Sequence, residues 1–329
     1  MSLSFPNSSL YSLPKPTSDH TPIQLPMSTT IPKANLFRFE NAWLKHSDFL
    51  PAVLPAWLRG SPHGVAAAIV GSLKAVRCTS KAWARRKSVP PTLLPNCKFV
   101  IYLLDVLEEG RCLSAGEHLL CCDCQDHLVL VLRERAAYWK QRGKHRAIQE
   151  GDANTRFFHA QATQRLHCNN IRALEVDGVV VSSHQDKTAA LTSHHQGLLR
   201  VNTAASDSIG VAALYAESER VDEAPLLAPF MELEARIAVC SMNRSSSLGP
   251  DGFGPAFYAA AWSTVVPTVM ELAWAFQAGT AELEHLNRSY IVMISKHAAA
   301  TTPGDYRPIC LQNCSLKIIS KMLTTWLQH

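Results

Sequence analysis

The chain has 329 residues, with 32 Lys and Arg against 27 Asp and Glu, giving a formal net charge of +5 at neutral pH. Hydrophobic residues make up 47% and charged residues 18%, which excludes wholesale disorder and provides for about two domains. No apolar run reaches the roughly 18 residues of a membrane-spanning helix, and the small charge excess does not alone establish a nucleic-acid partner.

Residues 1–35 are rich in Pro, Ser and Thr and are expected to form no helix. The segment lacks the basic start and continuous apolar centre of a secretory signal, although its single acid, Asp19, leaves an organelle transit peptide as an alternative. Ten cysteines without such a signal favour reduced thiols. We therefore expect a protein of the nucleus or cytoplasm that is not secreted.

The segment from 36 to 57 is short, aromatic and interrupted by prolines. Apolar residues then recur at helical intervals and predict helices over 65–87, 97–109 and 114 to about 146. Ser114 followed by Glu117 is a capping box that opens the third helix. Together these segments predict a helical hairpin or arm rather than a compact domain.

After Gly151 the pattern changes. Gly249-Pro250-Asp251-Gly252 predicts a tight turn, and Pro255 and Pro267 are expected in the first turns of two consecutive helices, the second closed by Gly279. The other predicted elements are a hairpin over 171–181 around Asp177-Gly178, helices over 187–199, 231–242 and 315–327, and strands over 290–295 and 306–311.

A cysteine cluster raises the question of zinc. Cys121, Cys122 and Cys124 are flanked by His118 and His127. A C-x-x-C pair could supply half of a zinc site, but no second pair follows at structural-zinc spacing, and the cluster lies within a helical pattern. Thiols on a helix are the better interpretation, so we predict no metal site.

Motifs of nucleophilic catalysis are lacking: there is no G-x-S-x-G, phosphate-binding loop or H-E-x-x-H. A two-metal polymerase or nuclease needs clustered carboxylates, and the sequence has no Asp-Asp pair.

Basic clusters are more informative. The larger one interleaves cations with Tyr138 and Trp139, a composition suited to RNA or single-stranded DNA. Its cations are Arg133, Arg135, Lys140, Arg142, Lys144 and Arg146. The alternative is a solvated helix face whose aromatic rings pack into the core. Residues 81–87, with Trp83, form a weaker second cluster.

Several segments, read in order, resemble one family, the plant LINE-type (non-LTR) retrotransposon polyproteins. Residues 151–159 resemble the G-D-x-N-T-x-F-F-H signature ahead of the reverse transcriptase domain, and 137–141 resemble the W-K-Q element before it. Residues 249–253 resemble the G-P-D-G-F turn that opens the polymerase fingers. Residues 286–296 and 306–321 resemble the L-N-x-[ST]-x-I-x-x-I-P-K strand and the Y-R-P-I-S-L-x-N…K-I-I-S-K stretch.

The resemblance extends to the N-terminal part of the chain. Residues 16–23 resemble the S-D-H-x-P-I tail of the family's endonuclease domain, and 37–44 resemble its F-R-F-E-x-x-W-L segment. The resemblance implies that Asp19 and His20 match catalytic positions. Without the metal-binding residues that precede them in the family, we interpret both as endonuclease remnants.

For the polymerase, the resemblance implies that Lys296 and Arg307 line the path of nucleotide and template, where cations would neutralise phosphates. Salt-bridged surface cations are the alternative. The family reaction uses Mg²⁺ and deoxynucleotides, but the palm aspartates are absent from this sequence. Three departures put the detailed nucleotide-site geometry in question: Ser295 for Pro, Cys310 for Ser and Trp326 for Arg.

We therefore expect a predominantly helical α+β chain, with a helical linker arm followed by the partial fingers subdomain of a right-hand polymerase. The expected regions are 1–35 (endonuclease remnant), 36–165 (basic helical linker), 166–230 (connector with a hairpin) and 231–329 (fingers). The expected function is that of a truncated reverse transcriptase-like protein that binds RNA or DNA and lacks polymerase activity, with no small-molecule cofactor. The alternatives are a non-catalytic nucleic-acid-binding helical protein, and a poorly folding product with uncovered apolar faces.

Overall fold

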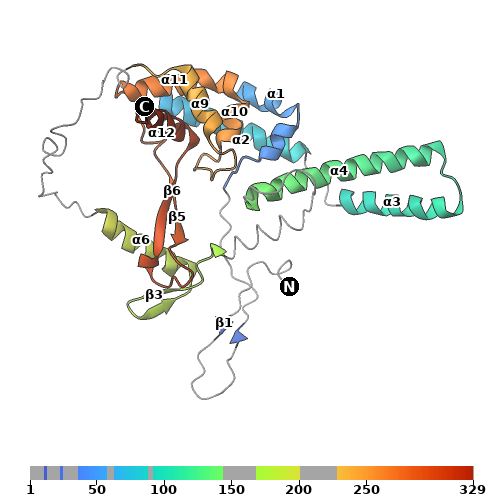
Figure 1. Cartoon of the computed structure of the whole chain (residues 1–329), viewed down its shortest axis with the longest axis horizontal. Helices are drawn as coiled ribbons and strands as arrows, with labels where there is room; N and C mark the ends of the chain where they lie inside the picture. Colours follow the sequence, from blue (N-terminus) through green and yellow to red (C-terminus); the bar gives the residue numbers. More distant parts are fainter. Residues whose placement is uncertain are drawn as a thin grey trace, which may run out of the picture. The chain divides into compact units, whose positions relative to one another are not determined.

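The computed structural model describes residues 11–12, 23–24, 36–57, 63–87, 92–143, 168–200 and 228–328, and Figure 1 shows the chain. The described part is predominantly helical with a few short strands, which confirms the expected α+β class. It forms two units. Unit 1 comprises Met1–Asn35, His159–Ser206 and Met293–Pro308, and unit 2 comprises Leu36–Phe158, Asp207–Val292 and Ile309–His329.

Unit 2 contains most of the helices. They are η1 (Asn41–Lys45), α1 (Phe49–Val53), η2 (Leu54–Ala56), α2 (Val65–Lys87), α3 (Leu93–Gly110), α4 (Ala115–Gly143), α9 (Glu232–Ser241), α10 (Pro255–Ala260), α11 (Trp262–Gln277) and α12 (Cys314–Trp326). Strands β5 (Tyr290–Ser295) and β6 (Tyr306–Leu311) pair with each other. The base of this ribbon belongs to unit 2 and its tip to unit 1.

Helix α2 supplies one wall of the core of unit 2. Its buried positions recur every three or four residues, as expected for one face of a helix. They include Ala66, Ile69, Leu73, Val76, Ser80 and Trp83. The predicted boundaries, 65–87, are confirmed. The helix packs beside α11 in the main core, so the arm that we expected over 65–146 starts only after α2.

Tryptophans tie the core of unit 2 together. The indole nitrogen of Trp57 donates to the hydroxyl of Thr268 at 3.2 Å, and that of Trp83 donates to a carboxylate oxygen of Asp48 at 3.2 Å. Trp326 stacks on Phe230 with ring centroids 4.4 Å apart. Trp57 and Trp83 thus each keep a partner for the indole N–H while their rings contribute apolar area, whereas Trp262 Nε1 is buried without a partner among the described residues.

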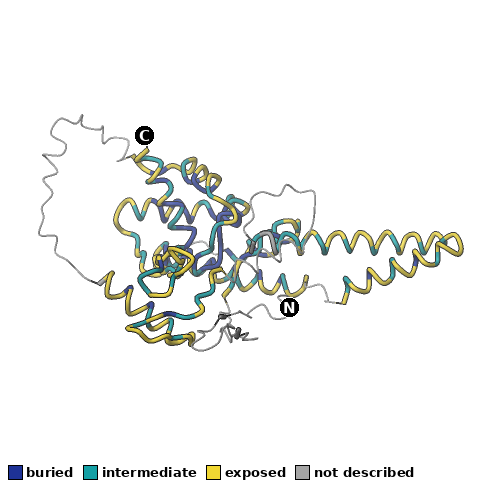
Figure 2. Tube along the Cα trace, turned by 60° about the horizontal axis from the view of Figure 1, so that its bottom comes forward, coloured by how far each residue is buried: buried dark blue, intermediate teal, exposed yellow. Residues whose placement is uncertain are grey.

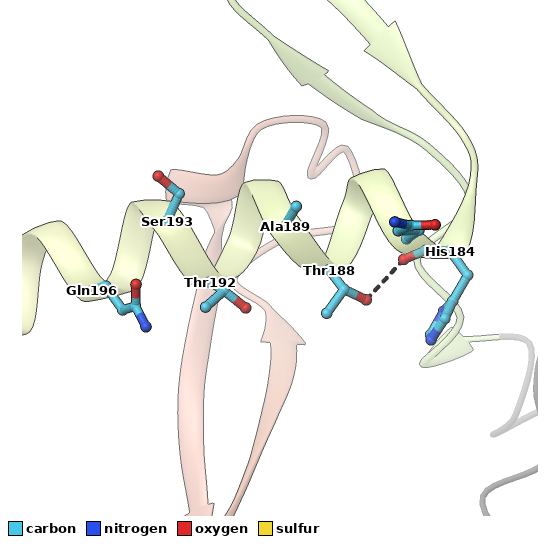
Figure 3. Close-up of a pocket in the computed structure, with 7 residues that line it drawn as sticks. His184, Thr188, Ala189, Thr192, Ser193 and Gln196 are labelled. Carbon is cyan, nitrogen blue, oxygen red and sulfur yellow. Dashed lines mark hydrogen bonds between the residues drawn. The ribbon is translucent and has the colours of Figure 1, made fainter.

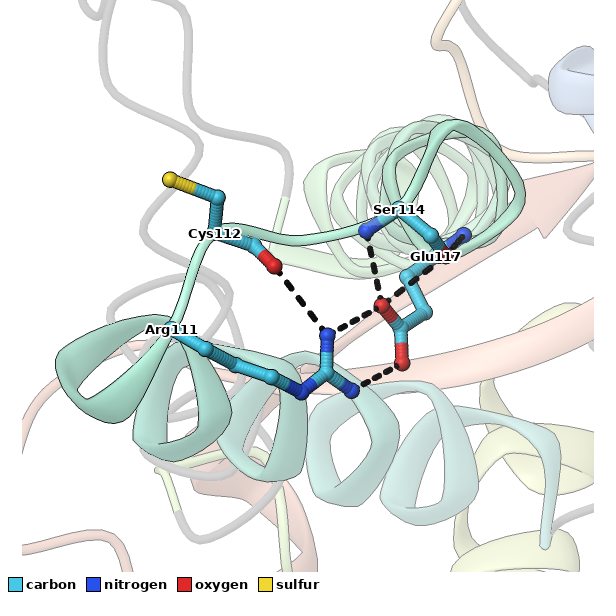
Figure 4. A network of polar contacts seen from close by, with 4 residues as sticks. All are labelled: Arg111, Cys112, Ser114 and Glu117. Carbon is cyan, nitrogen blue, oxygen red and sulfur yellow. Dashed lines mark hydrogen bonds and ion pairs between the residues drawn. The ribbon is translucent and has the colours of Figure 1, made fainter.

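Helices α3 and α4 lie side by side as a hairpin (Figure 1). In α3, Cys97 and Leu104 are buried, and Figure 2 colours the hairpin almost throughout as exposed or intermediate. The predicted capping box is confirmed: Ser114 N donates to Glu117 Oε2 at 2.8 Å and Glu117 N donates to Ser114 Oγ at 3.4 Å. Arg111 Nη2 donates to Glu117 Oε1 at 2.6 Å, which closes the turn between the helices (Figure 4). The guanidinium of Arg111, with Ser114 N–H and Oγ–H, lowers the pKa of Glu117 to about 2.

Proline positions are partly as expected. Pro255 begins α10, as predicted. Pro267 lies inside α11 rather than in its first turn, so that prediction was wrong. The helix starts earlier because Trp262 and Val265 pack on the core, and this packing outweighs the one hydrogen bond that a proline removes. Gly279 follows α11 with a φ of 69°, as its predicted closing role requires.

The described part of unit 1 contains short strands, one α-helix and one 3₁₀ helix. They are β1 (Tyr11–Ser12), β2 (Ile23–Gln24), β3 (Leu174–Val176), β4 (Val179–Val181), α6 (His184–Arg200) and η3 (Pro303–Asp305). Strands β3 and β4 are antiparallel, and Asp177 and Gly178 between them have φ values of 51° and 79°, as in a type I′ turn, so the predicted hairpin around Asp177-Gly178 is confirmed. Leu174, Leu191 and Tyr306 form a small core.

Candidate functional site

The turn at Gly249–Gly252 lies against two other segments of unit 2. Gly252 N donates to Gly249 O at 3.0 Å, and Gly252 has a φ of 80°. A Cβ on Gly249 would meet the carbonyl oxygen of Gln312 at 2.5 Å, and one on Gly252 would meet the carbonyl oxygen of Phe37. Only glycine at these two positions lets the turn approach the backbone of Gln312 and of Phe37 so closely.

Asn313 connects this turn to the segment that precedes β5. Its side chain is buried; Oδ1 accepts from Asp251 N at 3.1 Å, and Nδ2 donates to Leu286 O at 3.0 Å. One turn along α12, Lys317 Nζ donates to Ser247 O at 3.0 Å. The amide of Asn313 therefore fixes three backbone segments with one side chain.

The segment before η1 adds two further connections. Phe39 N donates to Gly252 O at 2.8 Å. From α4, Gln141 Nε2 donates to Phe39 O at 2.9 Å, while its Oε1 accepts from Asn41 N at 3.0 Å. Because Gln141 satisfies a donor and an acceptor together, it anchors the C-terminal part of α4 to η1.

Asp251 is the buried acid of this network. Its Oδ1 accepts from Phe253 N at 2.8 Å, and Arg77 donates to its backbone carbonyl at 2.7 Å. Its Oδ2, like the hydroxyls of Tyr258 and Ser315, is buried without a hydrogen-bond partner among the described residues. Burial raises the pKa of Asp251 to about 6, although Phe253 N–H, Arg77 and Lys317 act in the opposite direction. The network positions backbone; it presents no reactive group to solvent.

Lys296 and Arg307, the predicted nucleotide and template cations, both lie at the tip of the β5–β6 ribbon and are exposed. Lys296 Nζ donates to Gly304 O at 2.6 Å, and Lys296 N donates to Asp305 O at 2.8 Å. No ion pair involves either side chain within the described ranges. Both cations are available to a phosphate, Lys296 from a fixed position.

The loop that holds Lys296 is itself ordered by Asp305. Its Oδ2 accepts from Thr302 N, Thr302 Oγ1 and Thr301 N at 2.8, 2.9 and 3.1 Å. These donors, the amide of Thr302 first, hold the pKa of Asp305 well below its usual range. On α6, His195 is buried, and burial, with His194 and Lys296, lowers its pKa. The hydrogen bonds to Asp305 therefore fix the backbone around Lys296 at the tip of the β5–β6 ribbon.

Only some of the cations predicted in the larger basic cluster lie in the part of the chain that the structure describes. Arg133 and Arg135 are exposed on α4. Lys140 and Arg142 lie within α4, but their side chains are outside the description, as are Lys144, Arg146, Asp19 and His20 entirely. Arg133 and Arg135 are two residues apart, about 200° around the helix, so these two cations lie on different sides of α4.

The cysteines of the predicted half-zinc pattern lie on α4 as free thiols, spread around the helix. Desolvation, with nearby acids and thiols, raises the pKa of Cys121 and Cys124, which disfavours the thiolate that zinc binds. Across the described ranges, no three His, Cys, Asp or Glu side chains are grouped to hold a metal ion.

A cationic face that our sequence reasoning missed lies on α2. Lys74, Arg77, Lys81 and Arg85 are spaced three or four residues apart, and α2 contains no Asp or Glu. This α2 cationic face borders a groove beside the segment before η1, where Lys81 lies 5.9 Å from the ring centre of Phe37. The groove also includes Arg38, Glu40, Trp43 and Arg85. The three- and four-residue spacing of these cations is present in the sequence, whereas the cluster predicted there covered only residues 81–87.

A second depression runs along one side of α6 (Figure 3). It is lined by His184, Gln185, Thr188, Ala189, Thr192, Ser193 and Gln196. The hydroxyl of Thr188 already donates to His184 O at 2.8 Å, and the lining has no Lys, Arg, Asp or Glu. Its chemistry favours neither a phosphate nor a metal ion.

No protein-family model matches the chain, and no curated protein matches it. Among the described residues, no helix is both long and apolar enough to cross a membrane.

Proposed function

We propose that this chain contains the linker and the first part of the fingers of a LINE-type reverse transcriptase, and that it binds nucleic acid without extending a primer. The proposal comes from the family resemblance of separate motifs, since the sequence supplies no Asp-Asp pair for the metal-dependent reaction.

The observation that supports it best is the meeting of those motifs in one network. Five pieces of the chain that resemble the family, each chosen from sequence alone, are joined by the hydrogen bonds of Phe39, Gln141, Gly252, Leu286 and Asn313. A chance set of short matches would have no reason to share a buried hydrogen-bond network.

In this proposal Lys296 and Arg307 hold the phosphates of a template–primer duplex. The test is binding of a labelled RNA–DNA template–primer, with the exposed cation Arg288 as the matched control. We expect Lys296→Ala and Arg307→Ala each to weaken binding several-fold, and Arg288→Ala to have little effect. Equal affinities for all four proteins would remove these two cations from the proposal.

A primer-extension assay addresses the reaction itself. The full chain is incubated with the same duplex, Mg²⁺ and deoxynucleotides, and the primer length is followed. We expect no extension. Extension that depends on the added chain would overturn the claim that it does not polymerise.

A second candidate function, non-catalytic binding of single-stranded RNA or DNA, is favoured by the α2 cationic face. Lys74 and Arg85 are 11 residues apart, about 16 Å along the helix. Of the two cations between them, Lys81 is exposed and about 6 Å from Arg85 along the axis, whereas Arg77 donates to Asp251 O. The spacing of Lys81 and Arg85 suits consecutive phosphates, and the half-buried ring of Phe37 is a platform near the groove for a base.

The two basic regions can be compared directly. Affinity for a single-stranded RNA oligonucleotide is measured against salt for Lys81→Ala/Arg85→Ala and for Arg133→Ala/Arg135→Ala. Removing two phosphate contacts should reduce the slope of log affinity against log salt by about 1.4. We expect this for the α2 pair. If only the α4 pair changes the slope, the α2 cationic face is not the binding surface.

A further inference from the structure

An apolar stripe runs along α3 on the side away from α4. Phe99, Tyr102, Leu103 and Val106 are 64%, 65%, 46% and 44% exposed, whereas the opposite side of the helix buries Cys97 and Leu104. The four exposed residues occupy positions i, i+3, i+4 and i+7, so they form one continuous α3 stripe. Exposed apolar residues arranged in this way are typical of a helix–helix interface rather than a solvent face.

Charges border the α3 stripe on one side only. At 100° per residue, Lys98, Asp105 and Glu109 lie together along one edge, and all three are exposed. Asn96 and Gly110 lie toward the other edge. Lys98 makes no ion pair within the described part of the chain. The charged edge thus has a cation at one end and two acids at the other.

The distribution of charge along this edge of α3 is self-complementary when two copies pack antiparallel. The midpoint of the α3 stripe lies between Tyr102 and Leu103. If a second α3 packs antiparallel about a two-fold axis through this midpoint, Phe99 faces Val106 of the other copy. The charged edges of the two helices then lie next to each other. Lys98 then lies between Asp105 and Glu109 of the other copy, offset by about 3 Å along the axis from each. Parallel packing about a two-fold axis would set the charged edge of each copy against the uncharged edge of the other, so Lys98 would lose both of these ion pairs.

We propose that a second copy of this chain covers the α3 stripe, and that two α3–α4 hairpins form an antiparallel four-helix dimer. The two-fold axis makes the interface isologous, as in most homodimers. Leu103 packs against Tyr102 of the other copy at the centre, and the ion pairs of Lys98 set the antiparallel direction. This association is independent of any nucleic acid.

Sedimentation velocity of the full chain over a range of concentrations tests the proposal. We expect a reversible dimer. Leu103→Glu should raise the dimer dissociation constant about tenfold or more, because it buries a charge at the two-fold axis. Leu119→Glu, on an exposed leucine of α4 outside the stripe, is the matched control and should leave the dissociation constant unchanged. Far-UV circular dichroism of each variant measures whether it folds.

A charge exchange tests the geometry without disturbing the apolar core. Lys98→Glu alone should weaken the dimer, and so should Asp105→Lys/Glu109→Lys. All three substitutions together should restore it, because each pair is re-formed with opposite sign. A wild-type chain that is monomeric throughout, a dimer equally sensitive to Leu119→Glu, or a triple variant that stays dissociated would each overturn the proposal.

Discussion

The side-chain oxygen of Asn313 accepts a hydrogen bond from the backbone amide of Asp251 at 3.1 Å, across 62 residues of sequence. The same side chain donates to Leu286 O, so both halves of a buried amide are used. Three backbone segments of unit 2 depend on this one residue for their mutual position.

Replacing Asn313 by alanine should therefore be costly. Asn313→Ala leaves a buried N–H and a buried C=O without partners, which should lower the free energy of unfolding by about 2–5 kcal/mol. Urea denaturation followed by tryptophan fluorescence measures the loss. Asn287→Ala, at an exposed asparagine next to Leu286, is the control and should change the free energy of unfolding by less than about 0.5 kcal/mol.

Asp251 should make stability depend on pH. Because its pKa is about 6 in the folded chain against a reference of 3.8, the folded state holds its proton more tightly. Between these values the free energy of unfolding falls as pH rises, by about 3 kcal/mol at most. Asp251→Asn should lack this contribution, so the variant gains stability relative to wild type from about pH 4 to pH 7. Asp177→Asn, in the exposed β3–β4 turn, should stay parallel to wild type.

Two glycines should respond to alanine with opposite sign. At Gly249 the new Cβ would meet the Gln312 carbonyl oxygen at 2.5 Å, so Gly249→Ala should destabilise by about 2 kcal/mol or more. At Gly71, inside α2, nothing lies within 4 Å, so Gly71→Ala should stabilise by about 0.5–1 kcal/mol. Thermal unfolding of the two variants compares them. A stabilising Gly249→Ala would contradict the close approach of the two backbones.

Gln141 should control how firmly α4 is held at η1. Gln141→Ala removes both hydrogen bonds to Phe39 and Asn41, so the amide of Asn41 should exchange with deuterium faster, roughly tenfold for a loss of about 1.4 kcal/mol. Hydrogen–deuterium exchange with mass spectrometry detects this change. Gln125→Ala, at an exposed position on the same helix, should leave exchange in η1 unaltered.

Local features of the fold could be predicted from the sequence because their causes are local. The apolar spacing of α2, the Asp177-Gly178 turn and the Ser114–Glu117 capping box each involve residues within a few positions of one another. Pro267 was misplaced because the packing of Trp262 and Val265, which is tertiary, extends α11 ahead of it.

The same distinction between local and tertiary causes applies to the candidate site. Lys296 and Arg307 were selected by resemblance, and their function stays a prediction. Nothing in the sequence ties the Lys296 ammonium to Gly304 O, or joins Asn313 to Asp251, since these contacts require the chain to fold back. The α2 cationic face differs from these contacts, because the three- and four-residue spacing of its cations is present in the sequence and was not among our predictions.

The Trp57–Thr268 hydrogen bond spans 211 residues, and this separation has a consequence for biosynthesis. At translation rates of about 5–20 residues per second, Thr268 emerges about 10–40 s after Trp57. Throughout that time the apolar face of α2 lacks α11, the helix against which it packs in the core. Non-local contacts of this kind slow folding and lengthen exposure to aggregation. The apolar face of α2 should therefore be exposed to aggregation during synthesis until α11 is made.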